Sequence, residues 1–346
     1  MSKVVIGMSG GVDSSVAASL LKEQGYDVIG VTMETWQENG ETSEAVKDAR
    51  KVADDLGIPY YVLDFKKEFK CNVMDYFKDE YINGRTPNPC IACNRSVKWE
   101  ALLEKAKQLG ADYIATGHYS TIVKLENGRY ALKRADNLAK DQTYALYRLT
   151  QDQLSRTLMP VGHYSKDEIR KKAEDIGISV ADKPDSQDIC FIPDGDYAKF
   201  IKEHTDEEIK EGNFITPDGK VVGRHKGIIH YTVGQRKGLG VALGYPAFVI
   251  EIRPETNEVV IGSKEQSMIR SFKINNLNFM AVEDINEPMH LFTKIRYNHK
   301  GTYCTVERTG EDELTCTFDN PEKAVTPGQS AVFYKDDIVV GGGTII

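Results

Sequence analysis

The chain has 346 residues, of which 40% are hydrophobic, and it carries a formal net charge of −8. This length predicts two or three domains with enough apolar material for a core. The acidic balance argues against a protein that coats nucleic acid without specificity. No apolar run is long enough to span a membrane and the first residues lack a signal-peptide pattern, so we expect a cytoplasmic protein that is not bound to a membrane.

The first 120 residues alternate between strand-like and helix-like segments. Strands are predicted over 4–8, 28–33, 60–65 and 112–116, and helices over 14–24, 43–56, around 74–81 and over 96–109, with Ser96 as N-cap and an irregular loop over 83–94. This alternation predicts an α/β, Rossmann-like domain with a parallel sheet and helices on both faces. Ligands of such sheets bind at the carboxyl ends of the strands.

The later part of the chain has a different pattern. A hairpin is predicted over 120–134, with its turn at Asn127-Gly128, followed by helices over 152–159 and 166–176. From about residue 210, short strands between turns replace helices, and the tail predicts a small β-barrel. We therefore expect a catalytic domain over 1–205, a small central domain over 206–270 and a C-terminal β-barrel over 271–346.

Two segments contain no carboxylate, although the protein as a whole is acidic. They are residues 81–99 and residues 220–250, and the second holds Lys220, Arg224, Lys226, Arg236 and Lys237. Basic islands on an acidic protein favour one docked polyanion over unspecific binding. Loops that lack carboxylates by chance are the other interpretation.

The first strand runs into the segment Ser9-Gly10-Gly11-Val12-Asp13-Ser14-Ser15, and a helix follows at once. Glycines let a backbone approach a phosphate closely, and a helix N-terminus offers free N–H groups. The segment lacks the Gly-Lys-Ser/Thr ending of a Walker A loop. A carboxylate among phosphate-binding groups repels phosphate unless a cation lies between them, so Asp13 predicts Mg²⁺ beside a nucleotide.

Six cysteines in a chain of this size suit free thiols in a reducing compartment. Cys90 and Cys93 lie in the predicted loop before a helix, where the helix N-terminus favours a thiolate. Cys190 lies in a polar, carboxylate-rich segment. For Cys71, Cys304 and Cys316 we expect buried small residues without chemistry.

The glycine-rich segment resembles the SGGxDS loop of the ATP pyrophosphatase superfamily, whose members cleave ATP between the α and β phosphates. With it, the whole chain resembles the tRNA-specific 2-thiouridylase family. The matching segments are Met33-Glu34-Thr35-Trp36, Thr116-Gly117-His118-Tyr119, Lys140-Asp141-Gln142, Lys183-Pro184-Asp185-Ser186, Tyr231-Thr232-Val233-Gly234-Gln235-Arg236-Lys237-Gly238 and Pro327-Gly328-Gln329. The resemblance implies a nucleotide-binding domain, a small central domain and a C-terminal β-barrel.

The resemblance also implies a chemistry. ATP would activate O2 of a flipped uridine as an adenylate, at the wobble position (U34) of tRNAs for Lys, Glu and Gln. A cysteine desulfurase or a sulfur-relay protein would supply a persulfide to Cys190, and Cys93 would release its sulfur, leaving a Cys93–Cys190 disulfide. A monomer bound to one tRNA is expected.

The same resemblance assigns residues to these roles. Asp13, Cys93 and Cys190 would be catalytic. ATP would contact Gly7, Met8, Ser9, Gly10, Gly11, Val12, Asp13 and Ser14, with Met33 and Gly117 near the adenosine. The tRNA would contact Asn88, Pro89, Cys90, His118, Lys140, Asp141, Gln142, Arg296, Tyr297 and Gln329.

One residue departs from the family pattern, which has Asp where this chain has Cys90. Cys90, Cys93 and Cys190 would suit a [4Fe–4S] cluster with one open iron, so a cluster-bound sulfide is the alternative to the persulfide. A structural zinc site would need a second cysteine pair, which the sequence does not supply. Two other functions remain open: an ATP-dependent ligase or amidotransferase of the same superfamily, and an iron–sulfur RNA-binding protein that only senses nucleotide.

Overall fold

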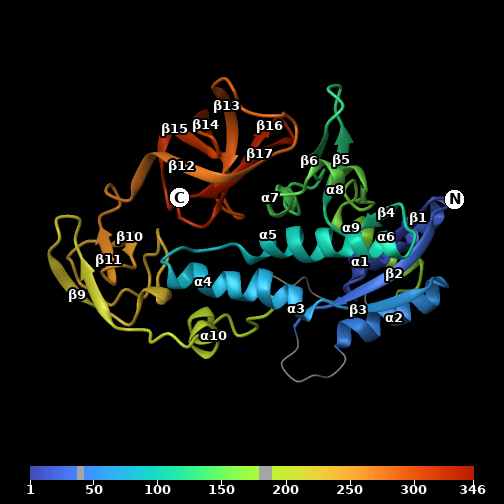
Figure 1. Cartoon of the computed structure of the whole chain (residues 1–346), viewed down its shortest axis with the longest axis horizontal. Coiled ribbons are helices and arrows are strands. Elements are labelled where there is room, and N and C mark those ends of the chain that lie inside the picture. Colours follow the sequence, from blue (N-terminus) through green and yellow to red (C-terminus); the bar gives the residue numbers. More distant parts are fainter. Residues whose placement is uncertain (37–42, 179–188) are drawn as a thin grey trace.

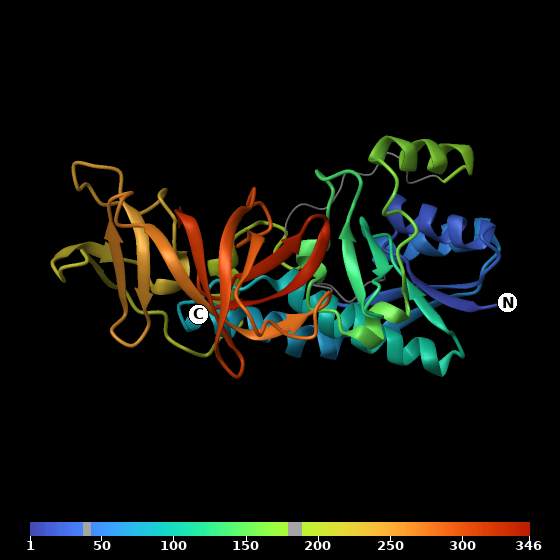
Figure 2. The ribbon, with the colours of Figure 1, turned by 90° about the horizontal axis from the view of Figure 1, so that it is seen from above.

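The computed structural model describes residues 1–36, 43–178 and 189–346. Figure 1 shows an elongated molecule, with the N-terminal α/β domain at one end, a small β domain at the other and a barrel above the helices that connect them. The view from above in Figure 2 shows the same order along the long axis. No helix of the described residues is long and apolar enough to cross a membrane.

The predicted parallel sheet is confirmed. Its strands are β1 (Lys3–Gly7), β2 (Asp27–Glu34), β3 (Tyr60–Asp64), β4 (Tyr113–Ala115) and β7 (Thr157–Leu158), in the order β3-β2-β1-β4-β7. All neighbouring pairs are parallel. The predicted helix over 152–159 is wrong in its second half, because α8 (Gln151–Ser155) ends early and the chain enters the edge strand β7.

Alternate side chains of the central strand enter different layers of the core. Val4 and Ile6 pack with α1 (Val12–Glu23), α2 (Glu44–Leu56) and α9 (Lys166–Asp175). Val5 packs on the opposite face with α6 (Leu102–Gln108) and with side chains of the barrel. Because the strand has a two-residue period, both faces of the sheet are covered, as expected for a parallel sheet.

Two helical stretches join the sheet to the rest of the molecule. The first consists of α3 (Lys66–Phe69), the π-helix η1 (Lys70–Asp75) and α4 (Tyr76–Ile82). The second runs without a break through α5 (Pro89–Cys93), the π-helix η2 (Asn94–Ala101) and α6. The prediction that this helix starts at Ser96 is wrong: Asn88 is the N-cap and its side chain accepts from the N–H groups of Cys90 and Ile91.

The remaining elements form β structure. The strands β5 (Ser120–Lys124) and β6 (Tyr130–Arg134) make the predicted hairpin, and after the short helices α7 (Thr143–Leu146) and α10 (Tyr197–Glu203) comes a four-stranded sheet. Its order is β10-β11-β8-β9, from β8 (Gly212–Ile215), β9 (Val221–His225), β10 (Phe248–Arg253) and β11 (Glu258–Gly262), with the 3₁₀ turn η3 (Ile228–His230) between them.

The C-terminal barrel is confirmed. Its strands are β12 (Met268–Phe279), β13 (Met289–Lys294), β14 (Thr302–Gly310), β15 (Glu313–Lys323), β16 (Ser330–Lys335) and β17 (Ile338–Ile345). They follow the order β12-β15-β14-β13-β16-β17, and pairing of β12 with β17 closes the barrel. The hairpin strand β6 also pairs with β17, and the N–H of Arg134 donates to the carbonyl of Asp337 over 2.8 Å. A sheet therefore continues from the first domain into the barrel.

Candidate nucleotide and thiol site

The glycine-rich loop lies between β1 and α1, at the carboxyl edge of the sheet. Gly10 has a φ of 72°, and a Cβ there would lie 2.6 Å from the carbonyl oxygen of Ala45, so only glycine fits. The hydroxyl of Ser14 accepts from the N–H of Ser9 over 3.1 Å and donates to the carbonyl of Gly11 over 3.1 Å. These bonds hold the loop closed around the N-terminus of a twelve-residue helix, which suits a bound phosphate group.

Two further residues predicted to bind the nucleotide lie at the ends of neighbouring strands. Gly117 follows β4, and a Cβ there would lie 2.7 Å from the backbone nitrogen of Ser14. Met33 belongs to the end of β2, and its Cε would lie 3.6 Å from a Cβ on Gly7. The loop, Met33 and Gly117 therefore meet at one edge of the sheet, where ligands of such sheets bind.

Asp13 lies in the first turn of α1, and its carboxylate is engaged by two side chains. The ammonium group of Lys166 donates to Oδ1 and to Oδ2, both over 2.9 Å. The hydroxyl of Tyr119 donates to Oδ1 over 2.7 Å. The sequence pattern did not indicate Lys166 or Tyr119, because both are distant from the loop along the chain.

The three thiols predicted to carry sulfur lie within electrostatic range of one another. Cys90 and Cys190 are exposed, and Cys93 is partly buried in the apolar cluster that also contains Met33 and Phe191. Desolvation by the surrounding protein raises the pKa of Cys90 and of Cys190, and it raises the pKa of Cys93 to about 11. Proximity of these thiols to one another raises the pKa of Cys93 and of Cys190 further.

Lys98 is a residue that the sequence analysis missed. Its positive charge lowers the pKa of Cys90, of Cys93 and of Cys190 against the effect of burial. Cys93 is the residue before the π-helix η2, and Lys98 follows it by five positions. In a π-helix the backbone hydrogen bonds join residues five apart, so Lys98 lies little more than one turn after Cys93. A π-helical segment has no sequence signature by which Lys98 could have been found.

His118 lies beside this site as a neutral imidazole. Its Nδ1 pairs with the hydroxyl of Thr116 at 2.8 Å, and its ring centroid lies 5.3 Å from that of Trp99. Burial, and then the charge of Lys98, lower the pKa of His118 well below its usual value. A neutral ring at physiological pH offers one donor and one acceptor instead of a charge.

Candidate metal ligands are the His, Cys, Asp and Glu side chains of the described residues. Among residues 1–36, 43–178 and 189–346, no group of three or more His, Cys, Asp or Glu side chains has a geometry that would hold a metal ion. The segment with Asp182, Asp185 and Asp188 lies outside the described residues, as does the motif Lys183–Ser186. Cys71 is exposed, so its prediction as a buried residue is wrong, whereas Cys304 and Cys316 are buried as expected.

The residues predicted to contact tRNA occupy two kinds of position. Tyr297 is 41% exposed on the barrel, and burial of its hydroxyl, followed by the charges of Asp141 and of Cys90, raises its pKa. Asn88 caps the helix that carries Cys90, Pro89 is buried at its first turn, and Gln329 reaches the same loop from the barrel. Lys140 and Arg296 are partly exposed.

Asp141 and Gln142 use their side chains inside the protein. The Asp141 carboxylate is buried, accepts from the N–H of Ala135 and the hydroxyl of Thr143, and pairs with Arg134 at 3.4 Å. The Gln142 carbonyl oxygen accepts from the N–H of Tyr119 over 2.8 Å. Gln142 therefore holds the residue that follows His118, whereas Asp141 fixes the end of β6 and the start of α7.

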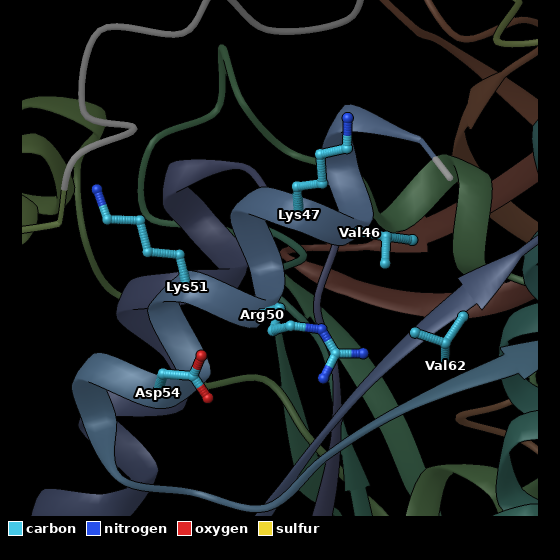
Figure 3. Close-up of a pocket in the computed structure, with 6 residues that line it drawn as sticks. All are labelled: Val46, Lys47, Arg50, Lys51, Asp54 and Val62. Carbon is cyan, nitrogen blue, oxygen red and sulfur yellow. The ribbon is translucent and has the colours of Figure 1, made fainter. Parts of the chain in front are cut away.

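A separate surface pocket lies on α2 and β3. Figure 3 shows Val46, Lys47, Arg50, Lys51 and Asp54 of the helix, with Val62 of the strand opposite. None of the residues predicted for nucleotide, sulfur or tRNA lines it. The guanidinium of Arg50 lies over the ring of Tyr60, 5.0 Å from its centroid, which is a structural contact.

Comparisons with known proteins cover the whole chain. Family models described as a tRNA methyl transferase HUP domain, a tRNA methyl transferase PRC-barrel domain and an aminomethyltransferase beta-barrel domain match residues 2–194, 198–263 and 269–345. The chain is 64% identical to the tRNA-specific 2-thiouridylase MnmA of Lachnoclostridium phytofermentans, over 100% of both chains. It is 53% identical to the protein of the same name in Acetivibrio thermocellus, over 99% of both chains.

Solved structures of lower similarity also match part of the chain. NMN synthetase from Francisella tularensis matches with a TM-score of 0.35 and 15% identity, over 60% of this chain and 78% of that chain. The full-length identity to the curated relatives decides the classification: this chain belongs to the tRNA-specific 2-thiouridylase family.

Proposed function

We propose that this chain, a tRNA-uridine 2-sulfurtransferase by its family, uses ATP to replace O2 of the wobble uridine U34 with sulfur. The observation that carries the proposal is the position of Met33. This side chain touches the strand that ends in the glycine-rich loop, and it belongs to the apolar cluster that holds Cys93. A nucleotide on the loop and a sulfur on the thiols would thus approach one base from two sides.

The first chemical step is adenylation. O2 of the uridine attacks the α-phosphorus of ATP, pyrophosphate leaves, and the oxygen becomes part of a good leaving group, AMP. The loop residues Gly7, Met8, Ser9, Gly10, Gly11, Val12 and Ser14 hold the phosphates in this proposal. Asp13 lies beside the phosphates in the same loop, and Met33 and Gly117 contact the adenosine. Free N–H groups at the start of α1 stabilise the charge that develops on the phosphates.

The second step transfers sulfur. A donor such as a cysteine desulfurase or a sulfur-relay protein leaves a persulfide on Cys190. The Cys93 thiolate attacks Sγ of Cys190, a Cys93–Cys190 disulfide forms and hydrosulfide is released. Hydrosulfide then adds to C2 and AMP departs. The charge of Lys98 favours the thiolate that this attack needs.

The base has to leave its stack to reach both reagents, and an unpaired anticodon loop lowers that cost. We propose that Tyr297 and the helix start at Asn88, Pro89 and Cys90 receive the extruded base. Aromatic side chains stack unpaired bases, and the ring of Tyr297 is exposed within the electrostatic range of Cys90. We propose that His118, Lys140, Arg296 and Gln329 also contact the tRNA, and that the protein acts as a monomer on the tRNAs for Lys, Glu and Gln.

The cysteine at position 90 supports a second route for sulfur delivery. A [4Fe–4S] cluster on Cys90, Cys93 and Cys190 would present a bound sulfide in place of the persulfide. The three thiols influence each other electrostatically, which favours this route, but the described residues form no ready-made metal site.

The test starts with anaerobic purification, iron and sulfide analysis, and a thiolation assay on unmodified tRNA. The persulfide route expects no iron, activity with a persulfide donor, and loss of activity in Cys93→Ala and Cys190→Ala. About four irons per chain, lost together with activity in Cys90→Ala, would establish the cluster instead. Cys71→Ala is the matched control, because Cys71 is also an exposed thiol but has no role in the proposed sulfur transfer.

The rival functions give other results. An ATP-dependent ligase or amidotransferase would keep its activity in Cys93→Ala and would incorporate no sulfur into tRNA. A protein that only senses nucleotide would release no AMP when tRNA and a sulfur donor are present.

A further inference from the structure

The ion pair between Asp13 and Lys166 joins the starts of two helices. Asp13 lies in the first turn of α1, and Lys166 is the first residue of α9, which packs against α1. The ammonium group donates to both carboxylate oxygens over 2.9 Å, and it lies 6.0 Å from the centroid of the Tyr119 ring. Lys166 is only 9% exposed. The Lys166 ammonium group therefore holds the Asp13 carboxylate in one position at the base of the glycine-rich loop.

The position of Lys166 is costly without a partner. A cation at the N-terminus of a helix faces the positive end of the helix dipole, and burial removes water from the ammonium group. The helix start is fixed by a capping box, in which Ser165 and Glu168 satisfy each other's backbone donors. The Asp13 carboxylate offsets both costs, and the rigid cap keeps the ammonium group on it.

The same contacts conflict with a magnesium ion held by Asp13. Mg²⁺ requires oxygen ligands at about 2.1 Å in octahedral geometry. Both oxygens of Asp13 already accept from Lys166, and Oδ1 also accepts from Tyr119. An ion on this carboxylate would have to displace the ammonium group or stand beside it against charge repulsion. The residues present do not fit a protein-bound Mg²⁺ at Asp13.

We propose that Lys166, and not a magnesium ion held by the protein, is the counter-ion that makes Asp13 compatible with the phosphates of ATP. The ammonium charge offsets that of the carboxylate, so Asp13 opposes the binding of phosphate at the N–H groups of the loop less strongly. Lys166 is thus a positioning residue that acts through Asp13. This inference rests on the proposed binding of ATP to the loop.

The test measures equilibrium binding of α,β-methylene-ATP, which cannot be cleaved between these phosphates, in magnesium and in EDTA. It uses the full-length protein without tRNA or sulfur donor. Lys166→Met leaves the Asp13 carboxylate without this counter-ion. We expect the affinity for the nucleotide to fall about tenfold or more, because the carboxylate then repels the phosphates. Lys166→Arg keeps the charge and restores most of the affinity. Asp13→Asn binds at least as tightly as wild type in both solutions, and Asp13→Asn/Lys166→Met recovers the affinity lost in Lys166→Met.

Several outcomes would overturn the inference. Wild-type affinity in Lys166→Met is one, and loss of magnesium-dependent affinity in Asp13→Asn is another, because it would identify Asp13 as a metal ligand. Thermal unfolding checks each variant, and Lys166→Arg and Asp13→Asn decide the matter where Lys166→Met fails to fold. Wild type that binds no nucleotide would overturn the ATP-dependent function as well, so the two failures are distinguishable.

Discussion

The side-chain amide of Gln329 donates a hydrogen bond of 2.8 Å to the backbone carbonyl of Thr86, and one of 3.2 Å to that of Pro87. The N–H of Thr86 in turn donates to the carbonyl of Pro327 over 2.8 Å. The Thr86 hydroxyl pairs with that of Thr232, 3.2 Å away. The segment that leads to Cys90 is therefore held by the barrel on one side and by the central β domain on the other.

Replacing Gln329 with Leu removes both amide bonds and leaves two carbonyl groups without this donor. We expect the ordered conformation of the loop to lose about 1–3 kcal/mol of stability. The rate of thiolation should then fall, while the affinity for α,β-methylene-ATP stays unchanged. Single-turnover thiolation and nucleotide binding measure the two effects. Gln266→Leu is the control, because the Gln266 side chain bonds within its own turn at the N–H of Ser263. Equal loss of nucleotide affinity would show that Gln329 stabilises the whole fold instead.

Burial raises the pKa of Cys93 to about 11, which predicts that this thiol reacts slowly with alkylating reagents in the free enzyme. Since the thiolate is the reactive form, alkylation of Cys93 should accelerate about tenfold per pH unit between pH 7 and 10. Lys98→Met removes a charge that lowers this pKa, so the pKa rises and alkylation at a given pH becomes slower. Mass spectrometry of iodoacetamide-treated protein measures the rate at each cysteine.

Lys105→Met is the control for that experiment, because Lys105 is an exposed lysine of α6, further along the same helical run than Lys98. A Cys93 rate that is flat above pH 8 would contradict the raised pKa, and an unchanged rate in Lys98→Met would remove Lys98 from the site.

The Asp141 side chain is predicted to stabilise the fold rather than to contact tRNA. Asp141→Ala removes the partner of Arg134 and strands the N–H of Ala135, which costs about 3 kcal/mol when the carboxylate is buried. Chemical unfolding of the variant measures this loss. Asp136→Ala breaks an exposed pair with His163 and should cost less than about 1 kcal/mol. A normally stable Asp141→Ala with weaker tRNA binding would instead support direct contact with tRNA.

Gly117 predicts a steric effect on nucleotide binding. The Cβ of Gly117→Ala would lie 2.7 Å from the nitrogen of Ser14 and 2.8 Å from the carbonyl carbon of Asp13, both backbone atoms. The start of α1 has to shift, so we expect at least about a tenfold loss of nucleotide affinity. Gly310→Ala, at the end of β14 in the barrel, serves as the control, because a Cβ there would lie 3.1 Å from the Cβ of Glu313 and far along the chain from the nucleotide loop. Equal affinities of the two variants would show that the start of α1 tolerates displacement.

The elements with strong local signals agree with the sequence prediction. Helix α2 shows why: Ser43 caps its start, Gly57 ends it with a φ of 64°, and its apolar residues recur at helical spacing. The helix start at Pro89 was missed because a proline-rich segment reads as a loop, although proline suits the first turn of a helix. The edge strand β7 has two residues, too few for any periodicity.

The site was predictable to the extent that its groups are close in sequence. The loop and the cysteines carry their own patterns, whereas Lys166 reaches Asp13 only through the packing of α9 on α1. The burial of Asp141 depends on Arg134 and on the barrel residue Tyr334, whose ring lies 5.5 Å from the guanidinium carbon of Arg134. Contacts of this range follow from the tertiary fold and leave no trace in local spacing.

The continuation of the β5–β6 hairpin into strand β17 has a consequence for how a large substrate is accommodated. A hinge needs a segment that can rotate freely, and backbone pairing across the junction removes that freedom. The barrel and the hairpin are therefore expected to keep a fixed spacing. A tRNA that binds across them would then have to adapt its own shape, so discrimination among tRNAs would depend on how easily each anticodon arm bends and unstacks.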